Sequence, residues 1–159
     1  TIYYDANWKG VATKELATYF LVIYNSSELQ IGNTAKEFYI TGELYLDGII
    51  PVSIDKNDGF KSQFKGHLIS YYKSGKKQAE IYKNNSCQNE GTYTKYFESG
   101  IRSGKGTFIN GKLEGLFYNF YEDGSGYEES DWKDGERKYD YVTQVTSDGK
   151  RTKIKSPKK

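Results

Sequence analysis

Few residues in this chain could carry out chemistry. His67 is the only histidine and Cys87 the only cysteine. A nucleophilic site needs a base beside its nucleophile, and the sequence places no histidine near Cys87. A single cysteine also excludes an internal disulfide and any metal site built from several cysteines. We therefore expect His67 to be a surface or half-buried strand residue and Cys87 to be a small residue in a loop.

The carboxylates are numerous, but their positions favour structural roles. Four acidic residues lie in turn positions, where hydrogen bonds to the backbone account for them: Glu98, Asp123, Asp134 and Asp148. The segment Asp55–Gly59 faintly resembles a calcium loop. An EF-hand loop needs an acidic residue at its twelfth position, where this chain has Gly66. A polar turn explains the segment better, and we expect no metal, no cofactor and no enzymatic activity.

The elements that would position a binding site come from a repeat of about 25 residues. Each unit holds an aromatic pair with a glycine three positions later: Tyr71-Tyr72 before Gly75, Tyr96-Phe97 before Gly100 and Phe120-Tyr121 before Gly124. A second glycine precedes each pair, and another aromatic residue follows it: Gly66, Gly91 and Gly115, then Tyr82, Phe108 and Trp132. An earlier copy at Phe38-Tyr39 before Gly42 implies an insertion of about eight residues around positions 50–60.

The unit is predicted to be a β-hairpin with a connecting turn. Its turn dipeptides are Ser74-Gly75, Ser99-Gly100, Asn110-Gly111, Asp123-Gly124, Asp134-Gly135 and Asp148-Gly149, with Asn84-Asn85 at one further place. Asn-Gly and Asp-Gly favour type I′ turns because both residues tolerate the left-handed conformation. An aromatic pair inside a strand would place one ring on each face of the sheet. Rings of successive units would then pack along the sheet and stabilise neighbouring hairpins.

The N-terminal third lacks this period. Thr13 could cap a short helix through Phe20, whereas Tyr19–Tyr24 fits a buried strand equally well; we favour a helix that runs into a strand. Turns are expected at Asn25–Ser27 and Gly32-Asn33, before strands at Glu28–Ile31 and Lys36–Ile40. We predict a mainly β protein of stacked antiparallel β-hairpin repeats in an elongated single-layer sheet, with a small N-terminal cap that contains a short helix. Its parts are the cap at 1–35, the repeats at 36–149 and a basic tail at 150–159.

Composition and charge agree with this architecture and limit the partners. The chain is 16% aromatic but only 36% hydrophobic, which favours strands with many half-buried positions. The last ten residues hold six of the 23 basic side chains and none of the 21 acidic ones, which leaves 17 basic against 21 acidic in residues 1–149. We expect a solvated basic tail and no nucleic-acid binding by the mildly acidic body. The longest apolar run, Tyr19–Tyr24, is far shorter than the roughly 20 residues of a membrane span, so we expect a soluble chain.

The segments Gly91–Gly100 and Gly115–Gly124 resemble the MORN repeat, in which a glycine precedes an aromatic pair and a further glycine. They are most similar to the bacterial variant with units of about 24 residues. The opening Tyr3–Lys9 and the segment Phe38–Gly48 resemble a module that precedes such repeats in envelope or exported proteins of Gram-negative bacteria. The resemblance covers residues 36–135 well and residues 1–35 loosely. It implies an exported scaffold or binding surface without catalytic residues, in a group often described as antitoxin-like; a cytoplasmic location stays open.

The function we expect is non-catalytic recognition of a protein or peptide on the repeat sheet, because aromatic rings and free strand edges suit such partners. The candidate partner-binding residues are Tyr71, Tyr72, Tyr96, Phe97, Phe120, Tyr121 and Trp132. Packing between these rings is the alternative for each of them. Two other functions stay open: glycan binding, with Trp8 and Trp132 as first candidates, and anionic-lipid contact through Lys150–Lys159. An immunity or antitoxin role would be one form of protein recognition, and the oligomeric state stays open.

Overall fold

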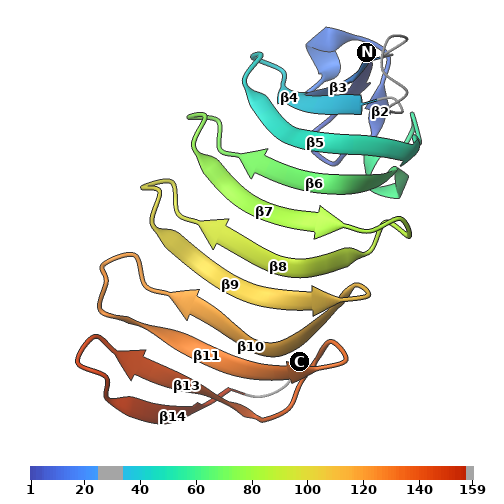
Figure 1. Cartoon of the computed structure of the whole chain (residues 1–159). Coiled ribbons are helices and arrows are strands. Elements are labelled where there is room, and N and C mark those ends of the chain that lie inside the picture. Colours follow the sequence, from blue (N-terminus) through green and yellow to red (C-terminus); the bar gives the residue numbers. More distant parts are fainter. Residues whose placement is uncertain (25–33, 157–159) are drawn as a thin grey trace.

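The structure is a computed structural model that describes residues 1–24 and 34–156. These residues form one open antiparallel sheet of 14 strands. From β14 to β3 the strands lie side by side almost in chain order, and β1 lies between β3 and β2. Figure 1 shows the result as a curved ladder of hairpins one strand thick. The predicted mainly β fold, a single-layer sheet of stacked hairpins, is therefore confirmed.

The strands are short and separated by tight turns. In the N-terminal part they are β1 (Ile2–Tyr4), β2 (Gly10–Val11), β3 (Tyr19–Tyr24), β4 (Thr34–Tyr39) and β5 (Leu44–Ser53), with the 3-10 helices η1 (Lys14–Leu16) and η2 (Gly59–Lys61). The repeats contain β6 (Gln63–Tyr71), β7 (Lys77–Lys83), β8 (Asn89–Tyr96), β9 (Arg102–Ile109), β10 (Lys112–Phe120) and β11 (Gly126–Lys133). The last strands are β12 (Glu136–Arg137), β13 (Tyr141–Thr146) and β14 (Arg151–Lys155).

The hairpin turns form two rows, one at each side of the sheet. We call the row that follows β4, β6, β8, β10 and β13 the aromatic edge; it lies on the left in Figure 1. Its turns share one geometry, in which the glycine N–H donates to the carbonyl three residues earlier, as from Gly75 to Tyr72 (2.8 Å) and from Gly100 to Phe97 (2.9 Å). These glycines have positive φ, as the left-handed end of such a three-residue loop requires.

The opposite edge uses the predicted type I′ turns. The sequence predicts the same turn at Asp123-Gly124 and Asp148-Gly149, but these dipeptides belong to the loops of the aromatic edge, where only the glycine has positive φ. Asn110 and Gly111 have φ angles of 49° and 80°, and Asp134 and Gly135 have 55° and 83°. Both residues of each pair are thus left-handed, which matches the twist of the flanking strands. In the turn between β7 and β8, Cys87 (φ 60°) takes the left-handed position that glycine holds elsewhere. Cys87 is a turn residue, as expected of a small residue in a loop.

In the three units from β6 to β11 the second ring of the aromatic pair lies outside the strand, which differs from the expected arrangement of one ring on each face, whereas Phe38 and Tyr39 both lie in β4. Strand β6 ends at Tyr71 and β8 at Tyr96, so Tyr72 and Phe97 are the first residues of their turns. The Tyr72 hydroxyl donates to the Tyr96 carbonyl (2.8 Å). The turn geometry explains the difference, because the third residue after this position must be the left-handed glycine.

The hydrophobic core lies at the N-terminal end of the sheet, around Tyr4, Leu21, Ala35 and Ile49. The predicted insertion covers this core. The Tyr4 hydroxyl donates to the carbonyl of Asp55 (3.0 Å), and the Gly59 N–H donates to the carbonyl of Trp8 (2.7 Å). Lys9 forms an ion pair with Asp58 (2.6 Å). The insertion therefore supplies a second layer where the sheet alone would leave apolar side chains exposed.

Two details of the N-terminal prediction need correction or lie outside the structure. The helix expected from Thr13 to Phe20 is only the short 3-10 helix η1, because Tyr19–Tyr24 forms strand β3 between β1 and β4. Thr13 makes no side-chain cap. The run of apolar and aromatic residues thus prefers the sheet, where Leu21 is fully buried. The turns and the strand expected within residues 25–33 lie outside the described residues.

Part of the C-terminal basic segment forms a strand, in contrast to the expected solvated tail. Residues Arg151–Lys155 form β14, which pairs with β13 in regular register. Arg151 forms an ion pair with Glu129, and Lys153 lies over the ring of Tyr141, 4.4 Å from its centroid. Ion pairing and cation–π contact hold this strand in spite of its high charge.

Candidate binding groove at the aromatic edge

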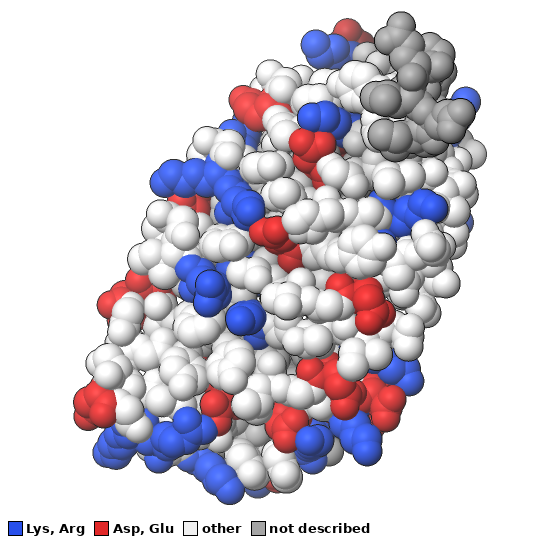
Figure 2. Space-filling model, in the orientation of Figure 1, with Lys and Arg blue, Asp and Glu red and all other residues white. Residues whose placement is uncertain are grey.

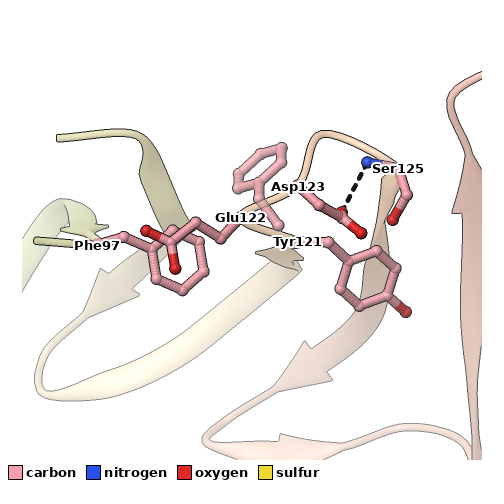
Figure 3. A pocket seen from close by; sticks show the side chains of 6 residues that line it. Phe97, Tyr121, Glu122, Asp123 and Ser125 are labelled. Atoms are coloured by element: carbon pink, nitrogen blue, oxygen red, sulfur yellow. Dashed lines mark hydrogen bonds between the residues drawn. The ribbon is translucent and has the colours of Figure 1, made fainter. Parts of the chain in front are cut away.

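Two neighbouring hollows lie among the turns of the aromatic edge. The first, of about 540 Å³, is lined by Phe97, Phe120, Tyr121, Glu122, Asp123 and Ser125. The second, of about 490 Å³, is lined by Ile101, Arg102, Phe120, Tyr121, Gly124, Gly126, Tyr127, Val145, Thr146, Ser147 and Gly149. Both hollows are lined by Phe120 and Tyr121, so we treat them as one groove, the turn groove. Figure 3 shows the first hollow.

The rings shared by the two hollows are fixed by contacts within the sheet. Phe120 lies beside Tyr118 and Tyr127, at centroid distances of 6.2 and 5.7 Å. The Tyr121 hydroxyl donates to Glu128 (3.1 Å) and accepts from Gln144 (3.1 Å). Burial raises the pKa of Tyr121 above its ordinary value, which favours the neutral hydroxyl that donates. The shared wall of the groove is therefore preorganised.

Phe97 breaks a ladder of hydrogen bonds along the aromatic edge. Tyr39 donates to the carbonyl of Tyr71 (3.0 Å), and Tyr72 donates in the same way to the carbonyl of Tyr96. The next residue of this series is Phe97, which has no hydroxyl to offer the carbonyl of Phe120. Its ring instead lines the first hollow. The apolar lining of the groove thus begins where the tyrosine ladder stops.

The rim of the first hollow is acidic. Glu122 and Asp123 both line it, and both are exposed. The Asp123 carboxylate accepts a hydrogen bond from the Ser125 N–H (2.9 Å), which is drawn in Figure 3. Hydrogen bonds from the Ser125 side chain and backbone lower the pKa of Asp123, so this carboxylate is charged at neutral pH. Among the described lining residues, the basic side chain is that of Arg102, which lines the second hollow.

Ile101 is the apolar residue that sequence reasoning missed. It is 49% exposed and directly follows the turn glycine Gly100. The corresponding positions after the other turn glycines hold polar residues: Lys76, Ser125 and Lys150. A large apolar side chain at an exposed position that is otherwise polar was the signal, and it became visible only once the turns were aligned. Arg102, Val145 and Thr146 carried no comparable signal.

The structure brings only part of the predicted set together. Phe97, Phe120 and Tyr121 meet in the groove. Tyr71, Tyr72 and Tyr96 lie on the same edge in the preceding units, where Tyr72 and Tyr96 are joined by a hydrogen bond. Trp132 lies near the far end of β11 from the groove, and its indole N–H donates to Ser130 (2.8 Å). The candidate site therefore contains three of the seven residues predicted to bind a partner.

The residues that the groove offers are suited to holding a ligand. Among its described lining residues there is no histidine, cysteine or lysine. His67 lies elsewhere, on β6, and contacts Glu80 on β7 (2.7 Å). No group of three or more metal-ligating side chains occurs in the described part of the chain. The groove can provide apolar contact, cation binding at its acidic rim and hydrogen bonds from hydroxyl groups.

The surface outside the groove carries mixed charge. Figure 2 shows basic and acidic side chains interspersed over the visible face. Within residues 1–24 and 34–156, no helix has the length and apolar character that a membrane span requires. No protein-family model and no curated protein matches this chain. The resemblance to MORN repeats and the exported location therefore stay predictions.

Proposed function

We propose that this chain is a non-catalytic binding module that recognises a protein or peptide segment through the turn groove. The observation that carries the proposal is that the two hollows share Phe120 and Tyr121 and together span three hairpin turns, with Ile101 exposed in the first of these turns. Apolar side chains held on a rigid scaffold and surrounded by polar groups are typical of recognition surfaces. The sheet holds Phe120 and Tyr121 in place before a ligand arrives, which lowers the entropic cost of binding.

Glycan and anionic-lipid binding are the alternatives. Some of the residues first considered for each already make contacts inside the molecule. Trp8, the first candidate for stacking a sugar, already stacks on Tyr19 (4.6 Å between centroids, 8° between planes). Within the basic segment, Arg151 is paired with Glu129 and Lys153 lies over Tyr141. An immunity role would be one case of protein recognition, and the product of a neighbouring gene would be the first partner to test.

The experiment is affinity capture from the source cell with three purified forms of the chain, read by mass spectrometry. One form is unchanged, one carries Ile101→Ser in the groove, and one carries Ile109→Ser. Ile109 is a matched control, because it is 48% exposed and ends β9 at the opposite edge. Folding of each form is checked by thermal unfolding before capture.

We expect a protein that the unchanged chain and Ile109→Ser retain and that Ile101→Ser loses. Loss of one anchoring side chain from an interface weakens binding by about tenfold or more. Equal retention by both variants would place recognition outside the groove and contradict the proposal. If no protein is captured, binding to a glycan array or to anionic vesicles would favour the alternatives.

A further inference from the structure

Two carboxylates near the groove have no hydrogen-bonded or ion-pair partner among the described residues. Five acidic side chains elsewhere form close ion pairs: Lys9–Asp58, Lys36–Asp47, Lys77–Glu80, Lys138–Asp131 and Arg151–Glu129. Glu98 and Glu122 occupy the same position in successive turns, directly after Phe97 and Tyr121. Within the described residues, neither forms an ion pair or a side-chain hydrogen bond. In the preceding turn the same position holds Lys73, so the acidic character begins at the groove.

The first hollow places the Glu122 carboxylate among aromatic rings. Glu122 and Asp123 line it together with Phe97, Phe120 and Tyr121, and in the view of Figure 3 the Glu122 side chain overlaps the Phe97 ring. A lysine or arginine side chain fits this chemistry, because its aliphatic stem packs on apolar surface while its charge stays near carboxylates and water. Aromatic rings add an attraction for the cation itself.

The molecule uses the same arrangement internally. Lys77 lies over the ring of Tyr96 (5.8 Å to the centroid) and pairs with Glu80 (2.8 Å). Each component of that contact, a ring and a nearby carboxylate, is present in the first hollow, but no described lysine or arginine lines it. The hollow therefore offers the same two kinds of group that hold Lys77.

The second hollow is mainly apolar in its lining side chains. Ile101, Tyr127 and Val145 line it, and it shares Phe120 and Tyr121 with the first hollow. A segment that crosses both hollows would present a basic side chain to the first and an apolar side chain to the second.

We propose that the ligand of the turn groove is a peptide segment in which a lysine or arginine lies next to an apolar residue. This inference rests on the proposed function and adds the chemistry of the ligand. The charge of Glu122 is complementary to the basic residue, and Asp123 and Glu98 add to the same field.

The test uses a random peptide library displayed against the folded chain, followed by titration of the best synthetic peptide. Binding is measured to the unchanged chain, to Glu122→Gln and to Glu136→Gln. Glu136 is a matched control because it is also exposed and lies on β12, at the opposite edge. A second peptide has glutamine in place of its basic residue, so that the four combinations with Glu122→Gln form a double-mutant cycle.

We expect enriched peptides to contain a basic residue beside an apolar one, and Glu122→Gln to weaken binding by about fivefold, as the loss of one exposed ion pair allows. Glu136→Gln should bind as the unchanged chain does, and Glu122→Gln should not weaken the glutamine peptide further. Enriched peptides without basic residues, or equal binding by both variants, would overturn this inference. If peptides without basic residues were enriched and bound the Ile101→Ser variant more weakly than the unchanged chain, the proposed function would stand. A library without any enriched peptide would contradict both.

Discussion

At the scale of single residues, Phe117 packs over the backbone of β9, where two buried glycines leave room for its ring. A Cβ atom at Gly106 would lie 2.5 Å from Phe117 Cδ2, whereas one at Gly104 would meet nothing closer than 3.4 Å. The sheet is one strand thick, so the ring is covered here by lying on the part of β9 where Gly104 and Gly106 carry no side chain. The glycines of β9 are therefore packing residues.

We predict that Gly106→Ala destabilises the protein by about 1–3 kcal/mol, because the ring must move or the strand must shift. Gly104→Ala is the control and should cost clearly less. Chemical denaturation of the two variants and the unchanged chain measures both effects. Equal stability of the two variants would mean that Phe117 does not fill this space.

Glu37 is a buried acid in the core at the N-terminal end of the sheet. It is 5% exposed and pairs across the sheet with Leu21 and Leu46. Burial raises the pKa of Glu37 to about 7. The folded state therefore binds a proton more tightly than the unfolded state, so this residue favours folding when protonated. Its contribution is complete below the ordinary pKa of 4.5 and is lost as the pH rises through about 7.

We predict that Glu37→Gln removes this part of the pH dependence. The difference in unfolding free energy between the variant and the unchanged chain should shift in favour of the variant by about 3 kcal/mol between pH 4 and pH 8. Urea unfolding across this range measures the difference and cancels groups common to both chains. Parallel curves would show that Glu37 does not titrate in this range.

At the scale of elements, the turns explain why the hairpins stack in register. On the aromatic edge, hydroxyls of Tyr39 and Tyr72 bond to the next unit. On the opposite edge, Glu90 accepts from the Asn110 N–H and Glu114 from the Asp134 N–H, both at 2.8 Å. Each acid directly precedes a left-handed glycine at a register shift of the sheet, as expected of a β-bulge. The earlier units are therefore tied to the next at the aromatic edge, and the later units at the opposite edge.

We predict that Tyr72→Phe lowers the free energy of unfolding by about 1 kcal/mol, because the Tyr96 carbonyl loses its hydroxyl donor. Tyr82→Phe is the matched control, since Tyr82 is 46% exposed and its hydroxyl donates no hydrogen bond in the described part of the chain. Thermal and urea unfolding compare the two. An equal loss in both variants would show that the ladder does not stabilise the sheet.

The local elements could be predicted from sequence, and the long-range ones could not. Asn110-Gly111 and Asp134-Gly135 have the conformations expected of them because turn geometry depends on neighbouring residues. The role of the insertion depends on the contact between Lys9 and Asp58, two residues that lie far apart in the sequence. No local sequence pattern indicates this contact. For the same reason the aromatic period identified Phe97 but not Val145, which enters the groove from another hairpin.

At the scale of the whole molecule, stability is distributed unevenly along the sheet. The N-terminal end has a two-layered core around Leu21 and Ile49, whereas β14 is exposed along its whole length. In a repeat array each unit is stabilised mainly by its neighbours, so a terminal strand opens at the lowest cost. The groove lies between these extremes, on β8 to β13.

We predict a gradient of amide hydrogen exchange along the chain. Amides of β3, β4 and β5 should exchange most slowly, those of β8 to β11 at intermediate rates, and those of β13 and β14 fastest. Exchange followed by mass spectrometry of peptide fragments measures the gradient. Uniform protection from β3 to β14 would instead indicate a single cooperative unit.

The most direct test of the account is an NMR titration of the isotope-labelled chain with a peptide recovered from the display library. Glycine amides are separate reporters of the two edges. We expect shifts at Gly100, Gly124 and Gly149, which lie in the turns around the groove, and unchanged signals at Gly111 and Gly135 in the turns of the opposite edge. Shifts concentrated at Gly111 and Gly135, with the aromatic edge unaffected, would contradict the claim that the turn groove is the binding site.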